Sequence, residues 1–169
     1  MGKINPGVMS SASDEWATPA DLFAVLDREF GFTLDAAATA ENTKCRRFFS
    51  AEDNALSQDW PRMSDDCAVW LNPPYSQIGA FMAKAHASAL AGSLVVCLVP
   101  ARTDTRWWWS YAVPAVIRFL PGRLKFGDGR NSAPFPSAIV VMWPGLSVLG
   151  CRVNFWDWKK GAKWERACV

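Results

Sequence analysis

Residues 67–75 read Cys-Ala-Val-Trp-Leu-Asn-Pro-Pro-Tyr, an uninterrupted apolar run followed by a rigid polar turn. Such a run is typical of a strand buried on both faces, as in a parallel sheet. Consecutive prolines fix φ and remove two N–H donors, so the carbonyl groups of the turn are held in place. The oxygens of Asn72 and Pro73 then suit a planar –NH2 group, and Tyr75 offers a ring for stacking. The alternative is a Pro-Pro turn with a helix-capping Asn.

The segment upstream of this strand predicts a helix and a second strand. Thr18 is expected to be the N-cap, with Pro19 in the first turn and Asp21 three residues after the cap. An apolar face runs to Phe30 and Gly31 ends the helix. The strand 32–34 then leads into Asp35.

Downstream, helices and strands continue to alternate. The sequence predicts a helix over 78–91, strands over 94–99 and 116–120, and a hairpin between 122–126 and 137–143. This pattern indicates a single α/β domain with a Rossmann-like, mainly parallel sheet and a C-terminal antiparallel hairpin. Ligands of such sheets bind beyond the carboxyl ends of the strands, where Asp35, Asn72 and Arg102 are expected.

Length and composition restrict the class of protein. The 169 residues suffice for one core, and no apolar run approaches the roughly 20 residues of a membrane helix, so no membrane association is expected. Five scattered cysteines without a C-x-x-C pair, and one histidine (His86), predict neither a metal site nor a His-based triad. A reducing cytoplasm is the expected compartment.

The net charge of +2 conceals an uneven distribution. Residues 1–101 hold 7 Lys and Arg against 12 Asp and Glu, a net charge of −5, whereas residues 102–169 hold 11 against 4, a net charge of +7. A basic half favours contact with a polyanion, although two differently solvated surfaces of one domain would give the same numbers.

Seven short motifs in a fixed order carry a family resemblance between about Asp14 and Trp143. They are Trp16-x-Thr18-Pro19, Phe32-x-Leu34-Asp35-Ala36-Ala37, Asp59-Trp60, Asn72-Pro73-Pro74-Tyr75, Val99-Pro100-Ala101-Arg102-x-Asp104-Thr105, Gly122-Arg123-Leu124-x-Phe126 and Phe135-Pro136-Ser137. Together they resemble the phage-type DNA N6-adenine methyltransferases, which use S-adenosylmethionine. The NPPY tetrapeptide alone is shared with RNA and protein-glutamine methyltransferases, so those substrates stay open, as does a decayed homologue that only binds DNA.

The resemblance implies a role for each matching residue. Trp16, Thr18 and Pro19 would pack on the methionine end of the cofactor, and Asp35 would receive its ammonium group beside the small residues Ala36 and Ala37. Asp59 would accept a hydrogen bond from the cofactor's adenine, next to Trp60. The expected catalytic residues are Asn72, Pro73, Pro74 and Tyr75.

One departure from the wider methyltransferase pattern affects the cofactor's ribose. No Gly-x-Gly follows Asp35, so the acid that would hold the ribose is open between Glu41 and Asp53.

The implied reaction needs positioning more than a strong base. The adenine amine has a delocalised lone pair, and acceptors at Asn72 and Pro73 would favour its nucleophilic form. In duplex DNA the adenine must be flipped out, with Tyr75 as the stacking platform.

Basic residues of the second half are expected to contact double-stranded DNA. They are Arg102, Arg106, Arg123, Lys125 and Arg130, and Arg118 belongs to the same group. Because Arg123 and Lys125 alternate, they should share one face of an extended segment. At least one of Trp107, Trp108 and Trp109 is expected at an interface.

The domain boundaries expected from the sequence are a flexible tail over 1–13, the methyltransferase domain over 14–145, and a basic, Trp-rich extension over 146–169 packed on that domain. The sequence leaves open the oligomeric state, a homodimer included, and the DNA target, for which GATC is a family-level guess.

Overall fold

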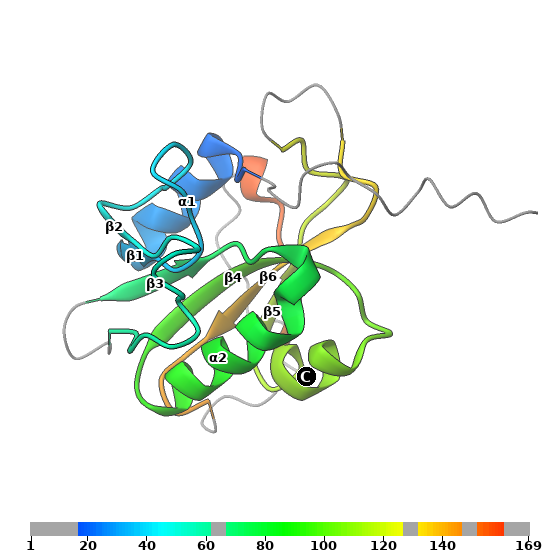
Figure 1. Ribbon diagram of the computed structural model, residues 1–169. Coiled ribbons are helices and arrows are strands. Elements are labelled where there is room, and N and C mark those ends of the chain that lie inside the picture. The colour runs from blue at the N-terminus through cyan, green and yellow to red at the C-terminus, as the bar shows by residue number, and fades with distance from the viewer. Residues whose placement is uncertain (1–16, 62–66, 127–131, 147–151, 161–169) are drawn as a thin grey trace, which may run out of the picture.

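The computed structural model describes residues 17–61, 67–126, 132–146 and 152–160. Over these ranges seven strands form one sheet in the order β2-β1-β3-β4-β6-β5-β7 (Figure 1). The elements in chain order are α1 (Ala20–Phe30), β1 (Phe32–Asp35), β2 (Arg47–Phe48), β3 (Ala68–Leu71), η3 (Tyr75–Gln77), α2 (Ile78–Leu90), β4 (Leu94–Pro100), η4 (Trp108–Ala112), β5 (Val116–Phe119), β6 (Ser137–Met142), β7 (Arg152–Phe155) and η5 (Trp158–Lys160).

Most neighbouring strands run parallel. The pairs β1–β2, β1–β3, β3–β4 and β5–β7 are parallel, and β6 is antiparallel to both β4 and β5. The predicted α/β fold with a mainly parallel sheet and a C-terminal antiparallel pair is therefore confirmed.

The predicted hairpin partner of β6 is wrong, because β6 pairs with β5 rather than with residues 122–126. All six residues of β6 are buried, so the strand needs an apolar neighbour on each side, and β4 and β5 provide them. Residues 122–126 lie in the β5–β6 connection, where Lys125 forms an isolated antiparallel bridge with Ser132.

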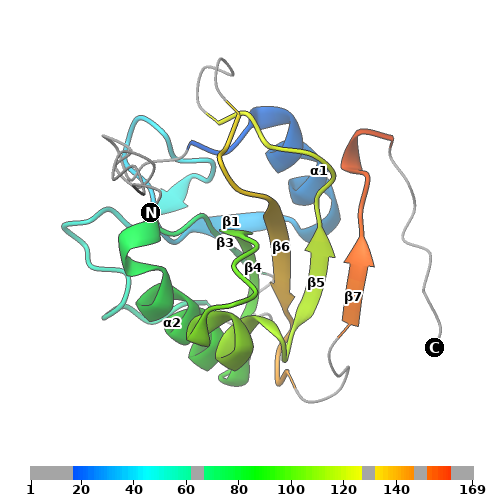
Figure 2. The same cartoon turned by 90° about the vertical axis from the view of Figure 1, so that its right-hand side faces the viewer.

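Helical segments cover both faces of the sheet (Figure 2). On one face, α2 and η4 pack with inward residues such as Leu71, Val99 and Val140. On the other face, α1 and the tryptophans near the C-terminus pack with Trp70, Leu98 and Ile139. In the part of the chain described here, no helix combines the length and apolar character that crossing a membrane requires.

The first helix begins one residue later than expected. Pro19 occupies the N-cap position, no side chain caps the helix, and the Phe23 N–H bonds to the Pro19 carbonyl. The prediction that Thr18 caps α1 is therefore wrong, and its hydroxyl is directed elsewhere. Gly31 ends the helix in the left-handed region with φ of 66°, as expected.

Residues 152–160 add β7 at the edge of the sheet, beside β5, and the turn η5. Trp156 and Trp158 are buried on the α1 side of the sheet. The tail expected over residues 1–13 lies outside the described residues.

Arg118 is not a surface residue, contrary to its grouping with the DNA-contacting arginines. It lies on β5 and is 5% exposed, and its guanidinium forms a two-point ion pair with Glu29 of α1 at 2.6 and 2.8 Å. The guanidinium also lies over the rings of Phe30 and Trp156. Its hydrogen bonds are used inside the protein, so it is withdrawn from the DNA-binding set.

Candidate functional site

A cavity of about 230 Å³ opens beyond the carboxyl ends of β1 and β3. Seven of the residues singled out from the sequence line it: Thr18, Asp35, Ala36, Ala37, Asn72, Pro73 and Pro74. They come from the segment before α1, from the end of β1 and from the turn after β3. Parallel pairing of β1 with β3 brings these strand ends together, with Asp35 opposite Trp70.

Asp35 places a buried carboxylate at the wall of this cavity. It is 3% exposed, and its two oxygens accept hydrogen bonds from the N–H groups of Lys44 at 3.0 Å and Ala37 at 3.4 Å. Burial raises the pKa of the Asp35 carboxyl from 3.8 to about 6, although these hydrogen bonds and the charge of Lys44 act in the opposite direction. A cationic ligand group in the cavity would offset this loss of solvation.

Small side chains follow Asp35. Ala36 and Ala38 are buried, and their N–H groups bond to the carbonyls of Trp70 and Phe49. The chain after β1 is thus tied to the neighbouring strands, and methyl groups rather than long side chains face the cavity.

The Asn72 amide is held by a residue from far away in the sequence. Its Nδ2 donates to Thr18 Oγ1 at 3.2 Å, across 54 positions of chain. Thr18 is 6% exposed, so the contact is shielded from solvent. This hydrogen bond turns the Oδ1 end of the amide away from Thr18.

The two prolines and Tyr75 connect this strand to α2. Pro74 is extended, with φ of −60° and ψ of 127°, and the following residues form η3, where the Gln77 N–H bonds to the Pro74 carbonyl. The Tyr75 ring does not line the cavity; it meets the Phe135 ring edge-on at a centroid distance of 5.3 Å.

Three predicted cofactor-binding residues lie outside the cavity lining. Pro19 caps α1, Asp59 is exposed, and Trp60 is buried with its ring N–H donating to the Ala55 carbonyl at 3.0 Å. Since Ala55 lines the cavity, Trp60 supports the wall from behind. The geometry gives no support to a ligand contact by Asp59, and Trp16 lies outside the described residues.

Neither acid considered for the ribose reaches the cavity lining. Asp53 is exposed, and hydrogen bonds from the backbone and side chain of Ser50 lower the pKa of its carboxyl. Glu41 is also exposed, and a hydrogen bond from the Thr39 side chain lowers the pKa of that carboxyl.

Residues that sequence reasoning missed complete the cavity wall. The polar ones are Thr39, Asn42, Lys44, Ser50, Asn54 and Gln77, and the larger apolar ones are Phe49, Leu56, Trp70 and Phe81. Asn54 has φ of 50°, in the left-handed region that Asn tolerates better than most residues. Its place in a polar turn was the one signal that could have drawn attention to it.

One thiol, that of Cys45, lies close enough to Asp35 to feel its charge. The pKa of the Cys45 thiol is raised to about 12, mainly by burial and to a smaller extent by the charges of Asp35 and Asp27. The thiol therefore stays protonated at neutral pH. Within the described ranges, no group of three His, Cys, Asp or Glu residues is arranged to hold a metal ion.

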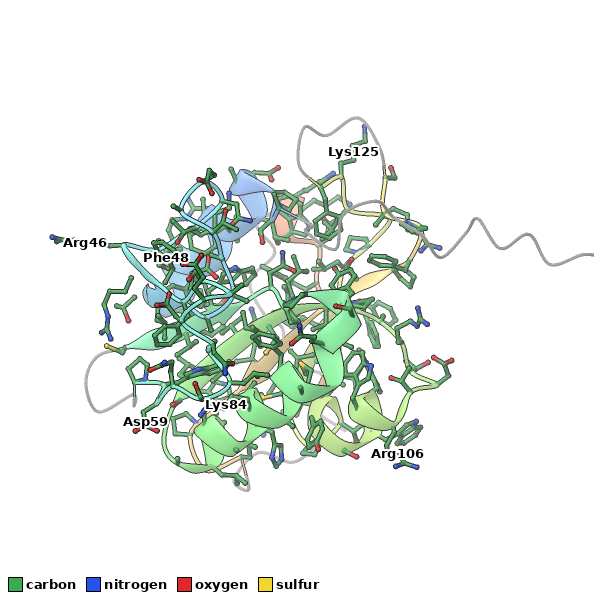
Figure 3. All side chains as sticks on the ribbon, in the orientation of Figure 1. Arg46, Phe48, Asp59, Lys84, Arg106 and Lys125 are labelled. Atoms are coloured by element: carbon green, nitrogen blue, oxygen red, sulfur yellow. The ribbon has the colours of Figure 1, made fainter. Side chains whose placement is uncertain are left out.

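Four of the predicted DNA-binding residues are exposed: Arg102, Arg106, Arg123 and Lys125. In Figure 3, Lys125 lies at the upper right and Arg106 at the lower right, whereas Arg46 and Asp59 lie on the left. Arg123 and Lys125 alternate with the buried Leu124 and Phe126, so they share the outer face of their segment. Arg130 lies outside the described residues.

The three consecutive tryptophans have different surroundings. Trp108 is buried and stacks on Phe119 at a centroid distance of 6.1 Å. Trp109 is 65% exposed, so its side chain is accessible to a partner, and the expectation that at least one of the three lies at an interface stays a prediction.

Comparison with known proteins places these features in a family. The profile of the family described as DNA N-6-adenine-methyltransferase (Dam) matches residues 7–145. A DNA N-6-adenine-methyltransferase of Escherichia phage T1 is 38% identical over 96 residues, which is 56% of this chain and 39% of that protein. One of Haemophilus phage HP1 (strain HP1c1) is 37% identical over 101 residues, 58% of this chain and 56% of that protein. The aligned regions thus span less than two thirds of either relative.

Proposed function

Because the chain belongs to the DNA N-6-adenine-methyltransferase family, we propose that it transfers a methyl group from S-adenosylmethionine to the N6 amine of adenine in double-stranded DNA. One observation carries the proposal: the Asp35 carboxylate and the Asn72-Pro73-Pro74 turn line the same cavity. An ammonium-binding acid and an amine-binding turn are the two recognition elements that this reaction requires.

The cavity residues suit the proposed cofactor. The buried carboxylate of Asp35 lacks full solvation and gains from an ammonium group, while Ala36 and Ala37 leave room beside it. The apolar side chains of Phe49 and Leu56 suit a flat ring. S-adenosylmethionine supplies an activated methyl group when bound.

For the cofactor's hydroxyl groups, we propose Ser50 and Asn54 in place of Glu41 and Asp53, because the former pair lines the cavity. Asp53 would then act indirectly, since it holds Ser50 through two hydrogen bonds of 2.8 Å.

The roles proposed for the catalytic turn follow from its donors and acceptors. Asn72 Oδ1 and the Pro73 carbonyl would accept the two N–H bonds of the adenine amine, which makes the nitrogen a better nucleophile. Neither group is a strong base, so the proton would leave after methyl transfer. Tyr75 would stack on the flipped base, supported by its edge contact with Phe135.

The decisive experiment incubates the purified chain with S-adenosylmethionine labelled on its methyl group and unmethylated duplex DNA. The DNA is then digested to nucleosides. Label in N6-methyladenine supports the proposal. Label found only in cytosine, in RNA offered in parallel, or in a glutamine-containing protein would overturn it. If no methyl group were transferred at all, the alternative of a decayed homologue that only binds DNA would be favoured.

The proposed setting is the cytoplasm of a bacterial host cell. A homodimer is compatible with the proposal, and the reaction itself requires only one copy of the cavity.

A further inference from the structure

We propose that Thr18 is a positioning residue, whose hydroxyl sets the orientation of the Asn72 amide so that Oδ1 rather than Nδ2 meets the target amine. The inference rests on the proposed function for the identity of that amine. The hydrogen bond between Thr18 and Asn72 is observed in the structure and does not depend on the proposed function.

The location of Thr18 frees its hydroxyl for this task. Ser and Thr before a helix commonly cap it, but in α1 the N-cap is Pro19 and no side chain caps the first turn. The Thr18 Oγ1 atom instead lies 3.2 Å from Asn72 Nδ2. Thr18 also lines the cavity, so it contacts both the cofactor space and the catalytic turn.

The orientation matters because the two ends of an amide differ in chemistry and hardly in shape. Oδ1 only accepts hydrogen bonds, and Nδ2 only donates them. A primary amine approaching Asn72 presents N–H donors, so a flipped amide would oppose donor to donor. The same Asn in the wrong orientation would therefore repel the group that it is meant to bind.

Thr18 can select the orientation only if its own proton is directed elsewhere. A hydroxyl has one donor and two acceptor positions. Here Oγ1 accepts from Nδ2, and within the described residues the hydroxyl donates no hydrogen bond, which leaves its proton for an acceptor atom in the cavity. An occupied cavity would then leave only lone pairs facing Asn72 and favour Nδ2 at that position.

Side-chain amide NMR tests the contact without requiring turnover. The full chain is labelled with ¹⁵N, S-adenosylhomocysteine is added, and the Asn72 signal is assigned by its loss in Asn72→Asp. In wild type, hydrogen exchange at Nδ2 should be about tenfold slower than in Thr18→Val, because one N–H is bonded in a shielded place. Thr18→Ser should keep the protection.

A matched control removes the same hydroxyl elsewhere. Thr33 lies on β1, and its buried Oγ1 has no hydrogen-bond partner among the described residues. Thr33→Val should leave the Asn72 signal unchanged. Equal exchange at Asn72 in wild type and Thr18→Val would overturn the proposal.

Single-turnover kinetics test the consequence for catalysis. Thr18→Val should slow methyl transfer about tenfold, and Thr18→Ser should restore most of the rate. In the Asn72→Asp background, where both ends of the side chain are acceptors, the additional loss from Thr18→Val should be about threefold or less.

The outcomes separate this proposal from the function on which it rests. The same fold loss in both backgrounds would mean that Thr18 acts on the cofactor alone, which overturns the positioning role. If Asn72→Asp shows no turnover, the exchange experiment decides. If wild type methylates no adenine, the proposed function fails, and Nδ2 protection still reports whether Thr18 holds the amide.

Discussion

Asn72 and Asp35 stand at the ends of adjacent strands, and the proposed chemistry divides between them. Asn72→Ala removes an acceptor for the target amine but leaves the Asp35 side of the cavity unchanged. We expect the single-turnover methylation rate to fall by about 10²–10³, the cost of losing one well-placed polar group at the reacting centre. Affinity for S-adenosylhomocysteine, measured by calorimetry, should change by about threefold or less. A rate near that of wild type would refute the assigned role.

The raised pKa of Asp35 predicts that, as the pH rises, the stability of the free protein falls while its affinity for the ligand rises. Burial raises the pKa of the Asp35 carboxyl from 3.8 to about 6. Between about pH 4 and pH 6, Asp35 is therefore mostly protonated in the ligand-free folded protein but mostly ionised in the unfolded chain. The stability contribution of Asp35 is thus largest below about pH 4 and is lost as the pH rises through 6. Asp35→Asn should be more stable than wild type by up to about 3 kcal/mol at pH 7.5 and equal to it near pH 4.

Affinity for S-adenosylhomocysteine should fall in wild type by up to about tenfold per pH unit below pH 6, because the ammonium group prefers the ionised acid. Asp35→Asn should bind weakly at every pH. Urea denaturation and calorimetry between pH 4 and 7.5 measure the two trends. An affinity of wild type that is constant over this range would contradict the contact.

The places of the Asn72-Pro73-Pro74 turn and of Asp35 in the cavity wall were predictable from the sequence, because each stands at the carboxyl end of a short apolar strand. The remaining cavity wall was not, since Ser50 and Asn54 lie in an irregular stretch without hydrophobic periodicity. Thr18 shows a second limit. Its sequence context matches a helix cap, and only the approach of Asn72, 54 residues away, redirects the hydroxyl.

At the scale of elements, the pair formed by Arg118 and Glu29 joins β5 to α1. Glu29→Gln takes the carboxylate from a buried guanidinium and should cost about 3 kcal/mol of unfolding free energy. Arg118→Met should cost less, because Met can fill the space between Phe30 and Trp156 and leaves Glu29, whose side chain is 41% exposed, partly hydrated. Urea denaturation measures the unfolding free energies of the two variants, which are comparable if the dependence on urea concentration (the m value) stays the same.

A solvent-exposed ion pair serves as the control for the buried pair of Arg118 and Glu29. Lys160 and Asp157 lie 3.4 Å apart, with the Lys160 side chain 81% exposed, so Lys160→Gln should cost about 0.5 kcal/mol or less. If Glu29→Gln cost no more than that, the buried pair would not hold α1 on the sheet.

The same pair explains a general limit of element-level prediction. The bounds of α1, α2, β1, β3, β4, β5 and β6 agreed with their hydrophobic patterns to within one or two residues, whereas β2 and β7 were not predicted and residues 122–126 are not a strand of the sheet. The charge of Arg118 suggested a surface position, but a carboxylate and two aromatic rings from other elements compensate its burial. The pairing of β6 with β5 likewise depends on burial on both faces, which a hairpin pattern does not encode.

At the scale of the whole molecule, the charge asymmetry agrees with the separation of the two proposed surfaces. Asp35 of the acidic half lines the cavity, and the exposed cations Arg102, Arg106, Arg123 and Lys125 follow the end of β4. These cations lie on two connections, before η4 and between β5 and β6. A basic residue count alone would have included the buried Arg118, so exposure decides which charges can meet phosphates.

The salt dependence of DNA binding tests this surface. Each neutralised phosphate contributes about 0.9 to the slope of log affinity against log salt. The double variant Arg123→Gln/Lys125→Gln should therefore lower the slope by about 2, and weaken binding at low salt most, if both residues contact phosphates. Arg46→Gln/Lys84→Gln removes the same two charge types away from Lys125 (Figure 3) and should leave the slope unchanged. If wild type and the Arg123/Lys125 variant had equal slopes, these two residues would not contact DNA phosphates. If the slope decreased equally in both double variants, the effect would be a nonspecific one of net charge.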